Sequence, residues 1–181
     1  MSIKAQIPNA LTLFRYAAVA MLLAAWFMPA PYGTWGPLII VVLASITDFF
    51  DGYLARKWKV ESELGRLLDP NADKLLIAAA LILLASNGFA DVVAVVLILS
   101  RELFISGLRE FMAERNITVH VTKLAKWKTT TQMFAIILLL FAYACGCLIS
   151  KIYADWILWI ATGLTLVTGF QYLRSSLASL R

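Results

Sequence analysis

Long apolar runs separated by short polar segments make up nearly the whole chain. A helix needs about 20 consecutive apolar residues to cross the core of a bilayer, and six runs approach that length. They predict helices at about residues 8–30, 36–57, 69–87, 90–113, 128–149 and 154–173. The stretches PYGTWGP (31–37) and SNGFAD (86–91) predict tight turns between helices. We therefore expect residues 1–181 to form a single all-α domain.

The composition favours a membrane protein over a soluble one. Hydrophobic residues make up 61% of the chain, whereas roughly half the residues of a soluble domain are apolar. Together with the six apolar runs, this predicts an integral membrane protein built as a six-transmembrane-helix bundle, with the lipid bilayer as its surroundings. Nothing in the sequence indicates a nucleic-acid partner.

The basic residues predict how the bundle is oriented. Lys and Arg are retained on the cytoplasmic side of a membrane. The segments expected on the opposite side hold few charges, namely Lys151, Asp91 and Asp155. We therefore expect both termini to be cytoplasmic, with the protein in the cell inner (plasma) membrane. The basic residues that fall on the cytoplasmic side in this topology are Lys4, Arg15, Arg56, Lys57, Lys59, Arg66, Arg115, Lys123, Lys126, Lys128, Arg174 and Arg181.

Aromatic residues are expected to mark the ends of the spans. Amphipathic rings favour the boundary between lipid and water. The residues close to predicted span ends are Trp26, Trp35, Trp127, Tyr153 and Trp156.

The stretch DFFDGYLARKWKVESELGRLLDPNAD (48–73) places four aspartates beside apolar runs, where charge is costly. At helical spacing, Asp48 and Asp51 share one face of the second helix with Gly52, Ala55 and Arg56. On the third helix, Asp69 and Asp73 are one turn apart and share a face. If the chain turns back between these helices, the four carboxylates can converge.

Converging carboxylates repel one another unless a cation lies between them. Oxygen ligands select hard ions such as magnesium or manganese, and four acids suit two divalent ions that hold a diphosphate. Small residues at Gly52 and Ala55 would allow a nucleotide to approach the backbone closely. Two other interpretations exist: Asp69 before Pro70 could be a helix N-cap, and Asp48 with Asp51 could serve a cation pathway in a transporter.

The spacing D-x2-D-G-x2-A-R-x8-G-x3-D-x3-D resembles the signature of the CDP-alcohol phosphotransferases at every position. The resemblance implies a six-helix membrane enzyme, active as a homodimer, that displaces CMP from a CDP-alcohol with the help of a divalent metal. It implies metal ligands at Asp48, Asp51, Asp69 and Asp73, with Asp73 also as general base. It implies nucleotide contacts at Gly52, Ala55, Arg56 and Gly65. Asn9 and Thr12, on a polar stripe of the first helix with Arg15, are further candidates for nucleotide contact.

Three softer motifs, IPNALTLFR (7–15), SRELFISGLRE (100–110) and KWKTTTQM (126–133), resemble the branch of the family that uses sn-glycerol 3-phosphate as acceptor and CDP-diacylglycerol as donor. Arg101 and Arg109 are eight residues apart and so lie on nearly the same helix face, and Lys126 and Lys128 follow in sequence. Such cations suit an acceptor phosphate. They could instead anchor the protein to anionic lipid. Inositol phosphate, serine and cardiolipin branches remain alternatives, as does a cation-coupled transporter.

Overall fold

The computed structural model describes residues 3–58, 63–115, 117 and 124–179. Within these ranges it gives the helices but not the side chains of residues 3–13, 48–58, 63–73 and 124–126.

Every regular element of the described residues is an α-helix, so the predicted all-α class is confirmed. All six predicted helices are present, with boundaries that differ by several residues. In chain order they are α1 (Ile3–Trp26), α2 (Tyr32–Trp58), α3 (Glu63–Ser86), α4 (Val92–Glu114), α5 (Leu124–Cys145) and α6 (Leu148–Ser179).

The start of α3 decides between two interpretations of Asp69. Helix α3 begins at Glu63, so Asp69 lies within the helix, and the N-cap interpretation is wrong because a cap residue has non-helical backbone angles. The segment ELGRLL before Asp69 contains good helix formers and extends the helix toward the N-terminus. Asp69 and Asp73 therefore remain one turn apart on continuous helix.

The predicted turn at SNGFAD is confirmed. It lies between α3 and α4, where Gly88 adopts a φ of 70°, the Phe89 N–H donates back to the Leu84 carbonyl at 2.9 Å, and Asp91 caps α4 through the Val93 N–H at 2.8 Å. The predicted turn at PYGTWGP is wrong for most of its length. Helix α2 already begins at Tyr32, because the Pro31 carbonyl accepts from the Trp35 N–H at 3.0 Å.

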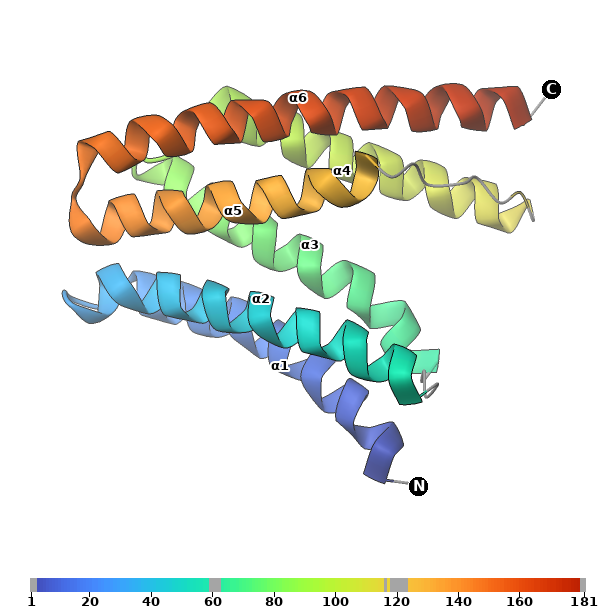
Figure 1. The fold of residues 1–181 in the computed structure, drawn as a ribbon, viewed down its shortest axis with the longest axis horizontal. Coiled ribbons are helices and arrows are strands. Elements are labelled where there is room, and N and C mark those ends of the chain that lie inside the picture. The colour runs from blue at the N-terminus through green and yellow to red at the C-terminus, as the bar shows by residue number, and fades with distance from the viewer. Residues whose placement is uncertain (1–2, 59–62, 116, 118–123, 180–181) are drawn as a thin grey trace.

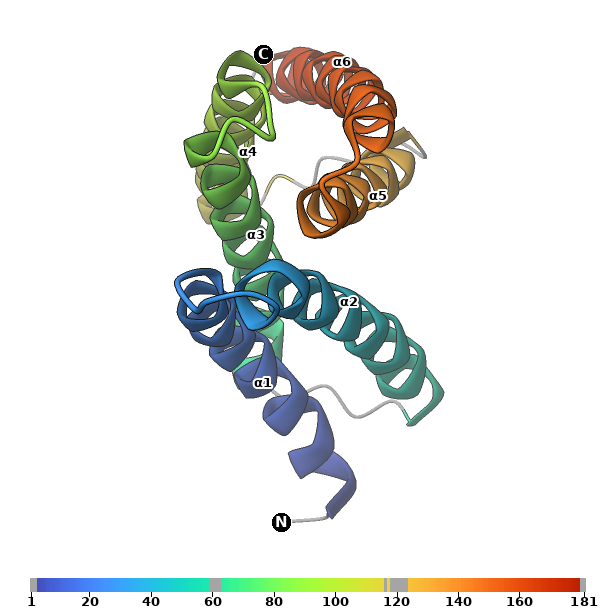
Figure 2. The same ribbon diagram turned by 90° about the vertical axis from the view of Figure 1, so that its left-hand side faces the viewer.

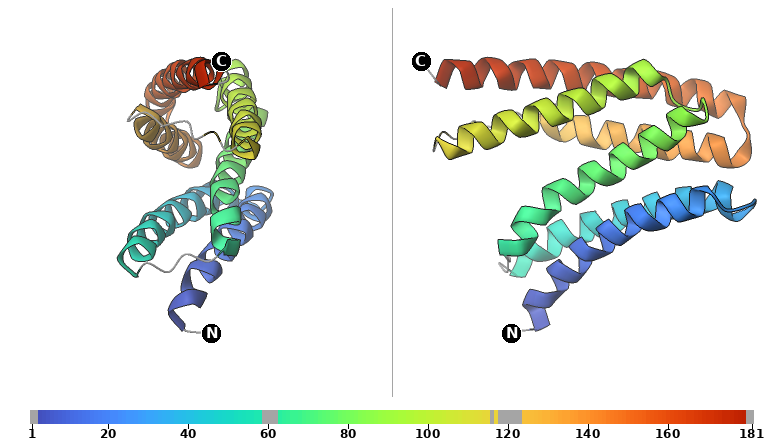
Figure 3. Two further views of the ribbon diagram at one scale, coloured as in Figure 1. Left: turned by 90° about the vertical axis from the view of Figure 1, so that its right-hand side faces the viewer. Right: turned by 180° about the vertical axis from the view of Figure 1, so that it is seen from behind.

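The helices form two groups, which are joined by α3 and by the packing of α2 against α5. Helices α5 and α6 pack side by side, and α4 lies against α6, whereas α1 packs against both α2 and α3 (Figures 1 and 2). Helix α3 runs diagonally from one group to the other, as Figure 3 shows from behind. Helix α1 begins and α6 ends toward the right-hand end of Figure 1, where α2 and α4 also end.

The bundle interior changes from apolar to polar along its length. Near the turns that join α3 to α4 and α5 to α6, the core is aliphatic and includes Leu84, Ile98, Leu140 and Leu158. Toward the other end, buried polar side chains replace it. They are Arg15, Lys128, Gln132, Thr162, Thr165, Thr168 and Ser176.

The surface carries many large apolar side chains, such as Leu103, Phe170 and Phe27, which are 76%, 68% and 80% exposed. So many exposed large apolar side chains are unusual on a soluble monomer. Within the described residues, two stretches are long and apolar enough to cross a membrane by length and composition alone, Trp127–Cys145 and Leu148–Ser179. Shorter apolar stretches are Phe14–Trp26, Tyr32–Thr47 and Lys74–Ser86.

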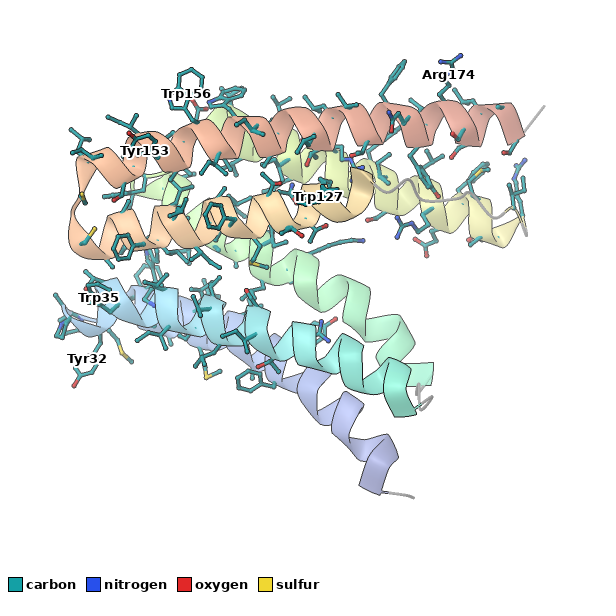
Figure 4. All side chains as sticks on the ribbon, in the orientation of Figure 1. Tyr32, Trp35, Trp127, Tyr153, Trp156 and Arg174 are labelled. Carbon is teal, nitrogen blue, oxygen red and sulfur yellow. The ribbon has the colours of Figure 1, made fainter. Side chains whose placement is uncertain are left out.

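Most of the aromatic residues expected at span ends are exposed there. Tyr153 and Trp156 project outward toward the left-hand end of Figure 4, and Trp127 projects from the first turn of α5. Trp35 is partly exposed at the same end, where its ring meets that of Phe141 on α5 edge-on. Trp26 is different, because it is only 7% exposed and stacks on Tyr143 with ring centroids 4.7 Å apart. Trp26 is thus a core residue, and the expectation that it marks the surface is wrong.

Candidate functional site

The aspartate motif divides between two helices at one end of the bundle. Asp48 and Asp51 lie near the end of α2, and Asp69 and Asp73 lie in the first half of α3. Gly52, Ala55 and Arg56 share α2, Gly65 is on α3, and Asn9 and Thr12 are on α1. The side chains of all these residues lie outside the described ones, so their convergence remains a prediction. The described side chains contain no group of three or more His, Cys, Asp or Glu that could hold a metal ion.

A polar cluster lies where α3, α4 and α5 meet, and one of its members directly follows the last aspartate of the motif in sequence. We define the polar cluster as Lys74, Arg101, Glu102, Ser106 and Lys128. Glu102 is its centre, because its Oε1 forms an ion pair with Arg101 Nη1 at 3.2 Å and another with Lys128 Nζ. The Arg101, Glu102 and Lys128 side chains are 11%, 16% and 10% exposed. Two cations from different helices are thus held by one largely buried carboxylate.

Lys74 connects the polar cluster to the helix of the motif. It follows Asp73 directly in α3, and its Nζ donates to Ser106 Oγ on α4 at 2.6 Å. The Ser106 hydroxyl in turn donates to the Glu102 carbonyl at 2.8 Å, one turn earlier in α4. Its proton is therefore directed away from Lys74, and its oxygen is free to accept.

Helix α6 provides polar partners for α4 and α5. Arg101 Nη2 donates to Thr168 Oγ1 at 3.1 Å, and Gln132 Nε2 donates to the buried Thr165 Oγ1 at 3.0 Å. One turn after Thr168, the guanidinium of Arg109 lies over the Tyr172 ring, 5.8 Å from its centroid. The hydroxyls of Thr165 and Thr168 thus accept hydrogen bonds from Gln132 and Arg101, whose donors aliphatic residues on α6 would leave unpaired.

The polar cluster has an excess of positive charge. Lys74, Arg101 and Lys128 share one carboxylate, Glu102, among the side chains that form it. Removing charges from water is costly, and a buried cation is stable only when it is paired. An anion with several oxygens would neutralise the excess charge of these described side chains, so the chemistry of the cluster suits phosphate.

The structure brings together some of the predicted acceptor-phosphate residues. Arg101 and Lys128 meet at Glu102, whereas Arg109 is exposed and contacts Tyr172. Lys126 is on α5, but its side chain lies outside the described ones. Sequence reasoning missed Lys74 and Ser106 as neighbours of this site. The available signal was the i, i+4 spacing of Glu102 and Ser106 beside Arg101, which places all three on adjoining parts of one helix face.

A hollow on the surface of α6 does not resemble a substrate site. It is lined by Ile152, Asp155, Trp156 and Trp159, all on α6. Its ionic feature is a pair within the same helix, Lys151 Nζ to Asp155 Oδ2 at 2.7 Å. Because these charges neutralise each other, the hollow lacks the excess charge of the polar cluster.

Comparisons with known proteins agree with the motif. The sequence model of the family described as CDP-alcohol phosphatidyltransferase matches residues 5–167. A relative from Rickettsia bellii is 42% identical over 176 residues, which cover 97% of each chain. One from Cereibacter sphaeroides is 38% identical over 214 residues, covering 97% of each chain. One from Haemophilus influenzae is 38% identical over 181 residues, covering 98% of this chain and 96% of its own. All three are named CDP-diacylglycerol–glycerol-3-phosphate 3-phosphatidyltransferase. The chain, with its eight signature positions from Asp48 to Asp73, belongs to the CDP-alcohol phosphatidyltransferase family.

Proposed function

We propose that the protein transfers the phosphatidyl group of CDP-diacylglycerol to sn-glycerol 3-phosphate, which gives phosphatidylglycerophosphate and CMP in phospholipid biosynthesis. The observation that carries this proposal is the match over nearly the full chain to relatives named for that reaction. The polar cluster supports it independently, because its excess positive charge suits an acceptor that carries a phosphate.

The residues of the aspartate motif are proposed to bind the metal ions and the nucleotide of the donor. Asp48, Asp51, Asp69 and Asp73 offer oxygen ligands alone, which fits two divalent ions, magnesium or manganese. When bound, such ions neutralise the diphosphate and stabilise the oxygens that attack and leave. Gly52, Ala55, Arg56 and Gly65 would contact the nucleotide, together with Asn9 and Thr12 of α1.

Asp73 is proposed as the general base. It would take the proton from the acceptor hydroxyl of glycerol 3-phosphate. The hydroxyl oxygen then bonds to the phosphorus that carries diacylglycerol, and the bond from this phosphorus to the CMP oxygen breaks. CMP leaves with that oxygen.

Arg101, Lys128, Arg109 and Lys126 would hold the acceptor phosphate, and we add Lys74 to this set. Lys74 comes from the same helix as Asp73 and lies in the polar cluster through Ser106. A phosphate bound between α3, α4 and α5 would therefore lie near the helix that carries the base. Charge-assisted hydrogen bonds from several cations would fix its position.

We further propose six membrane spans, both termini in the cytoplasm, and a cytoplasm-facing site in the inner (plasma) membrane. Support comes from the apolar surface, from the basic residues of the expected cytoplasmic segments, and from α1 beginning at the end of the bundle where α6 finishes (Figure 1). A homodimer is proposed from the family resemblance.

The test is an assay of acceptor identity. Purified protein is incubated with CDP-diacylglycerol and magnesium, and separately with glycerol 3-phosphate, inositol phosphate, serine or phosphatidylglycerol, while CMP and lipid products are measured. CMP release and phosphatidylglycerophosphate formation with glycerol 3-phosphate alone are expected. Product with a different acceptor would move the protein to another branch. No CMP with any acceptor would refute the enzyme, and metal-dependent solute uptake into vesicles would support a transporter.

A further inference from the structure

Helix α6 presents a small polar surface where α4 packs against it. Thr168 and Gly169 are both buried at this point, and Arg101 lies on them. Apolar residues on the outward face of the same part of α6, such as Val167 and Phe170, are exposed. The small and polar residues on the inward face of α6 therefore need an explanation other than contact with the surroundings of the protein.

Gly169 provides the space that the Arg101 side chain occupies. A Cβ atom added to Gly169 would lie 2.8 Å from Arg101 Nε, 3.0 Å from its Cγ and 3.5 Å from its Cδ. The first of these distances is shorter than normal van der Waals contact, so any side chain at Gly169 would displace Arg101. Among the described residues, Arg101 Nε has no hydrogen-bond partner, as expected for an atom pressed against the α6 backbone.

Thr168 fixes the other end of the guanidinium. Its Oγ1 accepts from Arg101 Nη2 at 3.1 Å and lies 2.8 Å from the Leu164 carbonyl and 3.0 Å from the Thr165 carbonyl. The hydroxyl donates its single proton in a hydrogen bond to these carbonyls, so a lone pair of its oxygen is left to accept from Arg101. With Nη1 held by Glu102 on the opposite side, the guanidinium has one defined position.

We propose that Thr168 and Gly169 are positioning residues that place Arg101 to bind the phosphate of the acceptor. This inference rests on the proposed function, because it takes Arg101 as a ligand of that phosphate. A planar guanidinium binds phosphate through parallel hydrogen bonds and is sensitive to orientation. Helix α6 thus sets the affinity for a phosphorylated acceptor without touching it.

The first test compares Gly169→Ala with Gly163→Ala, a matched change six residues earlier on α6. A Cβ at Gly163 meets nothing within 4 Å, and Gly163 is exposed. In Gly169→Ala, the glycerol 3-phosphate KM should rise roughly tenfold, about the effect of losing one hydrogen bond to a charged group. The CDP-diacylglycerol KM should stay unchanged, and kcat should fall less than the acceptor KM rises. Gly163→Ala should match the unchanged protein in all three.

Thermal unfolding in detergent separates mispositioning from misfolding. Alanine favours helix over glycine by a similar amount at both positions, so the helical preference does not distinguish the two variants. A Gly169→Ala variant that unfolds at a lower temperature and loses kcat and both affinities together would overturn the inference, since Gly169 would then have a structural role only.

The second test uses Thr168 and stays informative if Gly169→Ala does not fold. Thr168→Val keeps the shape of the side chain but removes the hydroxyl that accepts from Arg101 Nη2. It should raise the KM for glycerol 3-phosphate alone. Thr168→Ser restores a hydroxyl and should return the KM toward that of the unchanged protein. Equal acceptor kinetics in Val and Ser variants would overturn the inference. If the unchanged protein releases no CMP with glycerol 3-phosphate, the proposed function itself fails, which is a distinct result.

Discussion

Lys74 on α3 donates a 2.6 Å hydrogen bond to Ser106 on α4, 32 residues further along the chain. This bond connects the helix of Asp69 and Asp73 to the helix of Arg101 and Glu102. It links the two parts of the proposed reaction, because the phosphate of the acceptor and the base that deprotonates its hydroxyl would be held from neighbouring helices. The same geometry makes the role of Lys74 measurable.

Replacing Lys74 by Met keeps a long side chain and removes the charge. We expect the KM for glycerol 3-phosphate to rise roughly tenfold, because a phosphate loses one charged donor. The KM for CDP-diacylglycerol should change much less. Initial rates with each substrate varied in turn provide the measurement. Ser106→Ala is the control, since it keeps the Lys74 charge and should have the smaller effect. An unchanged acceptor KM in Lys74→Met would remove Lys74 from the site.

Glu102 should be essential for stability. In Glu102→Gln, Arg101 and Lys128 lose the carboxylate that both contact, and two buried cations remain close together. Breaking a buried ion pair on one side costs on the order of 3 kcal/mol. Unfolding in detergent should therefore begin at a lower temperature, and added glycerol 3-phosphate should restore more stability than in the unchanged protein. Glu110→Gln, at an exposed position of the same helix, should have little effect. Equal stability of the two variants would contradict this prediction.

Gln132 and Thr165 form a buried hydrogen bond between α5 and α6, which should show energetic coupling. Gln132→Leu or Thr165→Val alone leaves one buried polar group unpaired, at a cost of about 1–3 kcal/mol. The double variant has neither group and should lose less stability than the sum of the single changes. Unfolding of all four proteins in one detergent measures the difference. Strict additivity would show that the bond contributes nothing to the α5–α6 contact.

The sequence predicted the helices well because their apolar runs are long. The predicted start of α3 at residue 69 is too late, because ELGRLL is helical although its charged residues Glu63 and Arg66 interrupt the apolar run. It placed Trp26 at the surface because a residue near a span end is usually exposed, whereas Tyr143, more than a hundred positions away, covers it. Contacts between residues so far apart in the chain depend on how the helices pack, which the local sequence pattern does not specify.

The candidate site shows the same division. The local spacing of Asp48, Asp51, Asp69 and Asp73 was sufficient to identify the family motif. Contacts such as Arg101 with Thr168 join residues 67 positions apart, and nothing in the apolar pattern of α6 distinguishes Gly169 from Gly163. Only the packing of α4 on α6 does so.

The carboxylate motif predicts metal dependence. If Asp48, Asp51, Asp69 and Asp73 hold divalent ions, excess chelator should abolish CMP release, and added magnesium or manganese should restore it. Calcium is added in a parallel assay as a comparison. It also prefers oxygen ligands, but it binds them at longer distances and in a less fixed geometry than magnesium does. Full activity in excess chelator would refute the metal site.

The role of Asp73 can be separated from that of the other aspartates. Asp73→Asn keeps the size and one oxygen ligand but cannot accept a proton, so turnover should fall at least about a hundredfold, the lower range for lost general-base catalysis. CDP-diacylglycerol should still bind in the presence of metal. Asp51→Asn removes charge from a proposed metal holder and should weaken metal and nucleotide binding together with turnover. Metal-dependent nucleotide binding is measured beside CMP release for both variants. If Asp73→Asn keeps near-normal turnover, or loses nucleotide binding as completely as Asp51→Asn, then Asp73 is a metal ligand and another group must take the proton.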